Sequence, residues 1–366
     1  MQKYIAIRVH TALYLSVFFL ALHYVFVYFA NSSILSYFFK LSLPQVLVVY
    51  GVASLASILI YLWIASRKIL PTKTVIYIFI LLEMLALALM YNAITYAHAA
   101  LFVIAFGFHH LTTPYMLYNL DILFESYTHV EDRGKGRGIY MTMWNMPFII
   151  VPLLLSSLSV EKLPIVYIIS FLLLLPFIFF VYTYIQEPEK PHDQELIPSK
   201  TVWQRITHFW SDTLDRNSFL AQSTLHLYYG ITGVFLPVYL HSYFGFEWDK
   251  IGMLLLISST PFILFQIPFG SIEDKEHNEK KIFFWGIMIT ILFTILGLLV
   301  TPSMSYSFLF LALFIFLSKI GCSLIEIAME GTFYKHVTER NAFALMSFRA
   351  GRLFPYILGI LAVFWL

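Results

Sequence analysis

Four polar side chains lie on one face of a long apolar segment late in the sequence. Lys319, Ser323, Glu326 and Glu330 fall within residues 305–334, on one narrow stripe at about 100° per residue of an α-helix. If the segment spans a membrane, each ionisable group at its centre costs about 2.5–3.5 kcal/mol. The stripe is therefore expected to face a water-filled cavity or a partner helix rather than lipid.

Two interpretations of this stripe remain open. In the first, which we favour, Lys319 attracts an anionic group or alternates with a carboxylate. Glu326 then carries a coupling proton, and Glu330 is less central. In the second, the lysine forms a structural pair with an acidic residue on another helix and never meets a solute.

The apolar segment at residues 96–125 carries two polar faces. His110 and Asp121 share one face, while Thr112 and Asn119 share the other. We expect Asp121 to tie this helix to a neighbouring helix.

Other ionisable residues also interrupt apolar segments. Glu83 is alone near the centre of residues 74–91, and we expect a neutral, hydrogen-bonded structural acid more than a proton site. Arg349 and Arg352 lie one turn apart. Snorkelling to phosphate headgroups explains these two arginines about as well as a role in helix pairing or in a site.

Histidines recur in the first, fourth and seventh apolar segments: His23, His109, His110, His226 and His241. Histidine binds transition metals and is the side chain that most readily exchanges a proton near neutral pH. However, no pair has i,i+4 spacing, and no cysteine or acid completes a visible cluster. We predict no metal site, and His23, His109 and His226 remain candidates for lining a solute path.

The composition identifies the elements that must hold these residues. Of the 366 residues, 60% are hydrophobic and 12% are charged, and the mean hydropathy is +0.78. The apolar residues form runs of about twenty, the length of a membrane-spanning helix. We predict an all-α polytopic membrane protein with eleven spans. The predicted spans are residues 10–31, 44–66, 74–91, 96–125, 139–160, 163–185, 218–243, 250–270, 281–301, 305–334 and 343–366.

Basic residues mark one side of the membrane. Of the 23 Lys and Arg, 17 fall in alternate connections or at the N-terminus, whereas the other connections contain only Lys40, Lys162 and Lys250. This asymmetry predicts a cytoplasmic N-terminus. We expect the plasma (cell inner) membrane.

A polar stretch divides the chain into two halves. Residues 1–185 form a predicted six-helix half, residues 186–217 a cytoplasmic linker, and residues 218–366 a five-span half. In the linker, Trp203, Ile206, Trp210 and Leu214 recur at helical spacing. They predict a short amphipathic helix that lies on the membrane or caps the bundle. The chain ends in an apolar run, so we expect a twelfth helix to be missing.

The ends of the fourth and tenth spans resemble each other. His129-Val-Glu-Asp-Arg133 and His336-Val-Thr-Glu-Arg340 match in register at an offset of 207 residues. Repeated halves with a site between them are common in secondary transporters. The same offset aligns Thr112 and Asn119 with Lys319 and Glu326, which makes their face the cavity candidate.

The loop between spans eight and nine carries the most specific motif. It contains Gly270, Asp274, Lys275, Lys280 and Lys281 at the spacing G-x-x-x-D-K-x-x-x-x-K-K. It resembles a loop motif of the major facilitator superfamily. In this pattern the glycine allows two helices to approach closely, and the aspartate can cap the N-terminus of a neighbouring helix.

Two further segments are similar to the same family: Arg133-Gly-Lys-Gly-Arg137-Gly138 before span five, and Gly351-Arg-Leu-Phe-Pro355 with Gly359 in span eleven. The loop at residues 65–73 keeps the basic charge but lacks the family's glycine and aspartate. The drug/proton antiporters of this family typically carry a glycine–proline motif in span five. Span five of this sequence lacks a glycine, so the resemblance disfavours a drug exporter.

This resemblance implies two six-helix halves that rock around a central cavity lined by spans one, four, seven and ten. It places Lys319 and Glu326 on the solute path. It also implies that Asp274 pairs with the cytoplasmic start of span five, near Arg137, as a latch on one state. A solvated charged loop is the alternative.

Other functions lack the residues that they would need. The sequence contains no Walker A loop, G-x-S-x-G or H-E-x-x-H motif, so we expect no enzyme, no cofactor and no nucleic-acid binding. We predict a monomeric transporter of a small solute, secondary active or facilitated, with proton coupling through Glu326 or Asp121 as the default. The alternatives are a non-transporting receptor or scaffold of the same fold and, less favoured, a membrane-embedded transferase.

Overall fold

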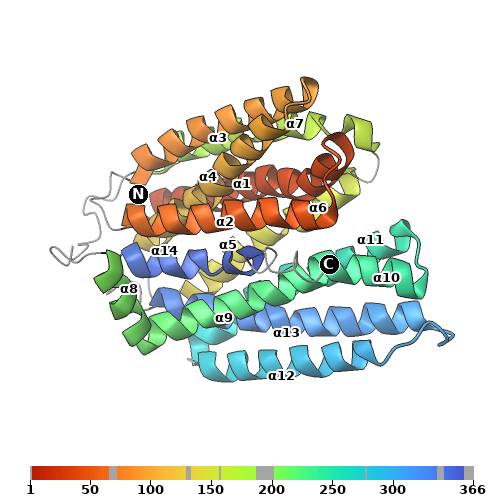
Figure 1. Ribbon diagram of the computed structural model, residues 1–366. Coiled ribbons are helices and arrows are strands. Elements are labelled where there is room, and N and C mark those ends of the chain that lie inside the picture. The colour runs from red at the N-terminus through yellow and green to blue at the C-terminus, as the bar shows by residue number, and fades with distance from the viewer. Residues whose placement is uncertain are drawn as a thin grey trace. The chain divides into compact units, whose positions relative to one another are not determined.

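The structure is a computed structural model that describes residues 2–65, 72–128, 133–155, 158–186, 202–276, 278–335 and 342–357. Throughout these residues the regular structure is helical (Figure 1). The helices before the linker are α1 (Gln2–Phe38), α2 (Leu43–Ala65), α3 (Thr72–Thr95), α4 (Ala99–Tyr127), α5 (Arg133–Asn145), α6 (Pro147–Leu155), a 3-10 turn (Val160–Lys162) and α7 (Ile165–Tyr184). The later helices are α8 (Val202–Ser211), α9 (Thr213–Gly230), a π-helical segment (Ile231–Phe235), α10 (Leu236–Phe244), α11 (Trp248–Glu276), α12 (Glu279–Leu298), α13 (Ser307–Lys335) and α14 (Ala342–Ala350).

Nine helical stretches of the described chain are long and apolar enough to cross a membrane. Each of the eleven predicted spans contains helix within its described residues, which exclude residues 358–366 of the last span. The predicted class of an all-α polytopic membrane protein is confirmed. The fifth, seventh and eleventh predicted spans are interrupted, the last by a turn at residues 351–353. The fifth is divided between α5 and α6, and the seventh between α9, the π-helical segment and α10.

Prolines lie close to the interruptions of the fifth and seventh spans. Pro147 is the first residue of α6, where its missing N–H leaves no intrahelical hydrogen bond unmade. Pro237 follows the π-helical segment and has no N–H to give to the carbonyl four residues earlier. A wider π turn is one way in which a helix accommodates such a loss, and single π turns recur at functional sites.

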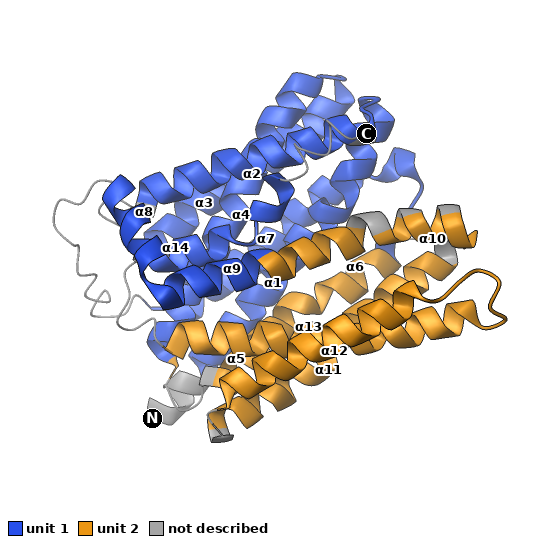
Figure 2. Ribbon diagram, turned by 60° about the horizontal axis from the view of Figure 1, so that its bottom comes forward, with its two compact units in different colours: residues 1–127, 154–223, 337–366 blue, residues 128–153, 224–336 orange. Residues whose placement is uncertain are grey.

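The helices group into two compact units (Figure 2). One unit contains residues 1–127, 154–223 and 337–366, and within it α1 packs on α7, α3 on α4, and α14 on α2 and α4. The other contains residues 128–153 and 224–336, and within it α5 packs on α11 and α13, and α12 on α13. Each unit therefore takes segments from both sides of the 186–217 linker. The division into halves at that linker remains a prediction.

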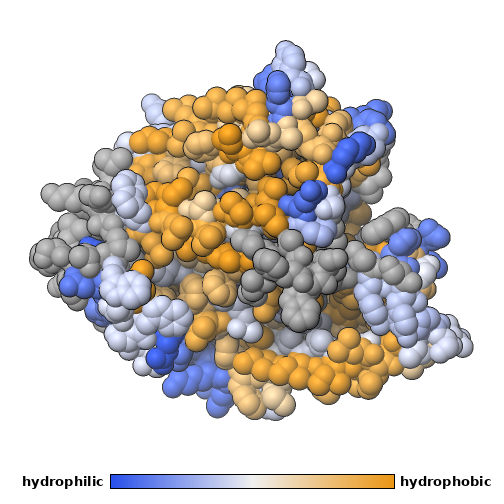
Figure 3. Space-filling view, in the orientation of Figure 1, coloured by the Kyte–Doolittle hydropathy of each residue, from blue (hydrophilic) through white to orange (hydrophobic). Residues whose placement is uncertain are grey.

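Large apolar side chains are exposed on the outer surfaces of these helices. Leu81 on α3 is 68% exposed and Leu298 on α12 is 71% exposed. Hydrophobic residues also cover broad areas of the face shown in Figure 3. Soluble monomers rarely expose such contiguous apolar area, whereas hydrocarbon tails accommodate it. The described surface fits a lipid bilayer.

Candidate functional site

Lys319 lies near the middle of α13 and is only 6% exposed. Its Nζ donates a hydrogen bond to Oγ1 of Thr232 at 2.8 Å. The same nitrogen lies 4.6 Å and 4.9 Å from the ring centroids of Tyr228 and Tyr229. Among the described residues no carboxylate oxygen comes within the 4.0 Å ion-pair distance of this nitrogen. A buried ammonium group is thus held by one hydroxyl and two aromatic faces.

The groups around Lys319 come from the interrupted seventh span. Thr232 belongs to the π-helical segment, and its hydroxyl also donates to the backbone carbonyl of Tyr228 at 2.8 Å. The Tyr228 hydroxyl lies 3.0 Å from Oγ1 of Thr294 on α12 and donates to Oγ of Ser318 at 3.3 Å. These contacts fix the tyrosine ring beside the ammonium group.

The remaining stripe residues on α13 are also buried. Glu326 accepts a hydrogen bond from Nε2 of Gln266 on α11 at 2.7 Å, and Gln266 accepts one from Nδ2 of Asn145 on α5 at 3.3 Å. Ser323 is fully buried, and its hydroxyl has no hydrogen-bond partner within the described part of the chain. The stripe therefore lies among helices and polar groups, away from the lipid-facing surface.

Glu330 continues this stripe toward the end of α13. Its Oε2 lies 4.0 Å from Nη1 of Arg137 on α5, and neither side chain is exposed. The Arg137 guanidinium group also lies 3.5 Å from the ring centroid of Tyr334. Arg137 is thus paired inside the helix bundle and does not reach the loop aspartate.

Asp274 instead binds the backbone at the start of α5. Its Oδ1 accepts from the N–H of Gly134 and its Oδ2 from the N–H of Lys135, each at 2.7 Å. A carboxylate at a helix N-terminus satisfies otherwise unpaired N–H groups and interacts favourably with the helix dipole. Asp274 therefore contacts the start of span five, as expected. The contact is made through backbone amides rather than through the Arg137 side chain.

Glycines allow this close approach. A Cβ added at Gly270 on α11 would overlap the backbone carbonyl of Gly134 on α5, and the reverse substitution would overlap Gly270. Lys280 and Lys281 lie exposed in the first turn of α12, while the Lys275 side chain lies outside what the structure describes.

Lys335 joins the same region, and the sequence analysis did not identify it as a site residue. Its Nζ lies 2.7 Å from Oε1 of Glu279, 3.0 Å from Oε1 of Glu273 and 4.0 Å from Oδ1 of Asp274. A contact between sequentially remote residues leaves no spacing signal that could have found Lys335.

The repeated segments follow the fourth and tenth spans, and most of their residues lie outside the described part of the chain, as does Gly359.

Asp121 on α4 lies against α14. Its Oδ2 accepts a hydrogen bond from Nε of Arg349 at 2.6 Å, and both residues are buried. On the other polar face of α4, Nδ2 of Asn119 donates to the Tyr115 carbonyl of its own helix, and the Asn119 Oδ1 has no partner among the described residues. Arg352 is half-buried.

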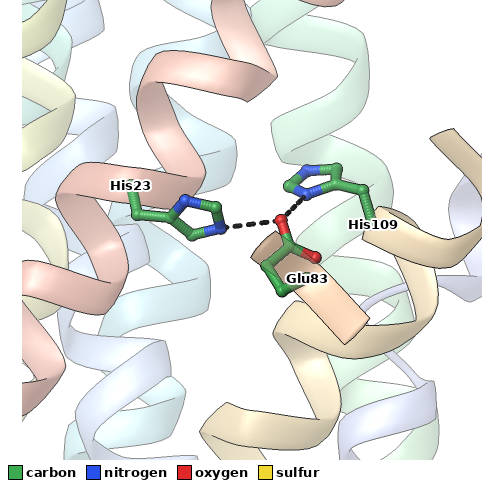
Figure 4. A group of neighbouring side chains, drawn as sticks. All are labelled: His23, Glu83 and His109. Atoms are coloured by element: carbon green, nitrogen blue, oxygen red, sulfur yellow. Dashed lines mark hydrogen bonds and ion pairs between the residues drawn. The ribbon is translucent and has the colours of Figure 1, made fainter. Parts of the chain in front are cut away.

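The histidines contradict one expectation. Glu83 on α3 is not alone, because it lies 2.6 Å from Nδ1 of His109 on α4 and 3.0 Å from Nε2 of His23 on α1 (Figure 4). The expectation that no acid completes a histidine cluster is therefore wrong, because Glu83 completes one. Spacing along one helix could not reveal it, because the three ligand atoms come from three helices. His226 lies elsewhere, with its ring 5.3 Å from that of Tyr229, and His110 lies 2.7 Å from Oγ of Ser54.

A family model described as the Major Facilitator Superfamily matches residues 13–360. The match covers nearly the whole chain, and the protein belongs to the major facilitator superfamily. A search of curated proteins found no matching sequence.

Solved structures show the same fold at low identity. A bacterial homologue of the iron transporter ferroportin is 14% identical with a TM-score of 0.74, and the match covers 98% of this chain and 91% of that one. The human organic anion transporter MFSD10 (TETRAN) is 12% identical with a TM-score of 0.70, with coverage of 98% and 92%. A variant of the E. coli fucose:proton symporter FucP is 13% identical with a TM-score of 0.71, with coverage of 97% and 89%.

These comparisons establish the class of protein. The chain is a multi-pass integral membrane protein of a family of transporters. Identities of 12–14% carry the fold alone, and the three solved relatives are named for different solutes. The solute of this chain has to be argued from its own residues.

Proposed function

We propose that this protein is a secondary transporter that moves a small anionic solute by alternating access, with Lys319 as the residue that binds the anionic group. The observation that carries the proposal is the buried Lys319 ammonium group, which has no carboxylate within ion-pair distance among the described residues. A buried cation with no carboxylate in direct contact is costly, and an anionic solute would supply a charge that contacts it.

The surroundings of Lys319 suit a site that changes between states. Thr232, its hydrogen-bond partner, belongs to the π-helical segment, and Pro237 follows that segment in α10. Interrupted helices leave backbone groups that can exchange partners, and discontinuous helices frame the binding sites of many transporters. The two tyrosine faces hold the ammonium group without neutralising its charge.

Contacts at two other places support an alternating-access cycle. Asp274 on α11 caps α5, and Arg349 on α14 binds Asp121 on α4. Each contact joins a segment before the 186–217 linker to a segment after it. In the proposed cycle, the halves at residues 1–185 and 218–366 separate on the cytoplasmic side only after these polar contacts break.

Proton coupling through Glu326 completes the proposal. The Gln266 amide donates to the Glu326 carboxylate, and an amide can reverse its orientation to accept a hydrogen bond from a protonated carboxyl group. Asp121 is less suited to carry the proton, since a buried guanidinium group holds its charge. The proposed orientation has the N-terminus in the cytoplasm of the cell's inner membrane, as the distribution of basic residues predicts.

The proposal is tested in proteoliposomes with single cysteines at Ser323 and Asn119 in a Cys322→Ser background. A membrane-impermeant maleimide applied from each side should label both positions, and a mixture of small carboxylates and phosphates should protect Ser323→Cys. Addition of Lys319→Ala should abolish this protection, whereas Lys162→Ala, at an exposed lysine of the 3-10 turn, should leave it unchanged. If neither position is ever labelled, the stripe is a buried structural element and the proposal fails.

A further inference from the structure

Two imidazole rings and one carboxylate converge in a buried cluster formed by His23, Glu83 and His109 (Figure 4). These side chains come from α1, α3 and α4, and their exposures are 0%, 0% and 2%. One nitrogen from each histidine and one carboxylate oxygen lie within 4.8 Å of one another. Three donor atoms from three helices therefore point at one place.

The contact on the far side of His23 favours one position for the proton on this ring. Nδ1 of His23 lies 3.3 Å from the backbone carbonyl of Ser170 on α7, and a carbonyl can only accept. In the neutral tautomer that donates to this carbonyl, the proton is on Nδ1 and Nε2 carries a lone pair. That lone pair faces the Glu83 carboxylate at 3.0 Å. In this tautomer two electron-rich atoms face each other, and a positive charge between them, a proton or a metal ion, would stabilise the contact.

The carboxylate is also held from outside the cluster. The Thr112 hydroxyl donates to Oε2 of Glu83, which leaves Oε1 facing His23 and His109. Metal-binding histidines commonly donate their second ring N–H to a carbonyl, and metal-binding carboxylates are commonly hydrogen-bonded in turn. Both supports are present here, on Ser170 and on Thr112.

We propose that His23, Glu83 and His109 form a binding site for one divalent transition-metal ion. Two imidazole nitrogens and a carboxylate oxygen suit Zn²⁺, Fe²⁺, Co²⁺ or Mn²⁺, whereas Mg²⁺ and Ca²⁺ prefer ligand sets made of oxygen alone. The Thr113 hydroxyl, 3.5 Å from Nε2 of His23, lies where it can orient a water molecule as a fourth ligand.

The distances admit an ion after a small adjustment. Metal–ligand bonds of about 2.0–2.1 Å place tetrahedral ligand atoms about 3.3 Å apart. The cluster contains separations of 2.6 Å and 3.0 Å, and its ligand atoms all lie within 4.8 Å of one another. Side-chain rotations that move the ligand atoms by less than about 1 Å bring the set to this spacing.

This site does not depend on the proposed role of Lys319. The cluster lies wholly in the unit that contains α1, α3 and α4, and Lys319 lies in the other unit. Metal binding can therefore be measured without transport, and failure of one proposal leaves the other standing.

The test measures binding of Zn²⁺ alone to protein that carries no polyhistidine tag and has been treated with a chelator. Equilibrium dialysis should give one Zn²⁺ per chain for the wild type. Glu83→Gln and His109→Gln should each weaken binding at least about tenfold. His110→Gln is the matched control, because His110 is the neighbouring buried histidine, bonds Ser54 and lies outside the cluster. Lys319→Ala should also bind normally.

A second measurement on the wild type avoids dependence on how well the variants fold. Zinc-edge X-ray absorption of the loaded protein should show two imidazole ligands with further oxygen. Absence of stoichiometric Zn²⁺ binding, or a shell without histidine, overturns the proposal. Equal affinity of the wild type and Glu83→Gln also overturns it. In those cases the cluster binds protons only.

Discussion

Asp121 and Arg349 form a buried pair that joins α4 to α14 across 228 positions of sequence, with Nε of Arg349 donating to Oδ2 of Asp121 at 2.6 Å. Neither charge has access to bulk water, since the side chains are 0% and 3% exposed. Each charge therefore depends on the other, and this mutual dependence makes the pair a structural connection.

Removal of one partner of this pair should lower the stability of the protein more than removal of both partners. Asp121→Asn or Arg349→Gln breaks a buried ion pair and keeps one of its two charges, and such a change costs about 3–5 kcal/mol in soluble proteins. The double variant should therefore be more stable than the sum of the single effects implies. Thermal unfolding in detergent, analysed as a double-mutant cycle, measures this coupling. Strict additivity would show that the two side chains do not interact.

The cap on α5 predicts a smaller effect with a conformational readout. Asp274→Asn keeps one acceptor oxygen but places an N–H group opposite a backbone N–H, and loss of a cap costs about 0.5–2 kcal/mol. If this contact holds one state, cytoplasmic maleimide should label Ser323→Cys faster in the Asp274→Asn background. Glu247→Gln, at an exposed acid just before α11, is the control. Unchanged labelling would show that the cap stabilises the helix contact without holding one conformational state.

The sequence predicted those features that depend on composition and local order. Apolar runs of membrane length predicted the helices. The resemblance of the loop with Gly270 and Asp274 to a family motif implied its contact with the start of span five. Membrane spans have strong sequence signals because lipid forces every backbone group into a helix. The interruption at Ile231–Phe235 was missed, since a π turn has no fixed residue pattern.

Contacts between helices were much harder to anticipate. Glu83 looked isolated because its histidine partners are 60 and 26 positions away. Lys335 was not singled out among the basic residues of the connections, although it contacts three carboxylates. Helical periodicity gives the face on which a residue lies but not the helix that faces it, so partners chosen by tertiary packing remain hidden.

The close crossing of α5 and α11 should require glycine at position 270 for full stability. Gly270→Ala adds a Cβ into the backbone of Gly134 and should lower stability by about 1–3 kcal/mol, as overpacking does in cores. Gly252→Ala is matched to it on the same helix, where an added Cβ meets nothing within 4 Å. That substitution should be neutral or slightly stabilising, because alanine favours helix more than glycine. Equal melting temperatures for the two variants would contradict the close crossing.

Lys319 and Arg349 are both buried cations, and they should respond oppositely to replacement by methionine. Arg349→Met removes the guanidinium group that binds the Asp121 carboxylate, and it should lower the melting temperature. Lys319→Met removes an ammonium group that forms no ion pair within 4.0 Å with a described carboxylate, and it retains similar volume. It should leave the melting temperature unchanged or raise it, because a desolvated charge is removed from the protein interior. The same Lys319→Met protein should fail to show protection by anions in the cysteine assay. A large loss of stability in Lys319→Met would instead mean that the lysine is a structural residue, because a solute-binding charge is retained at the expense of stability and a structural charge contributes to it.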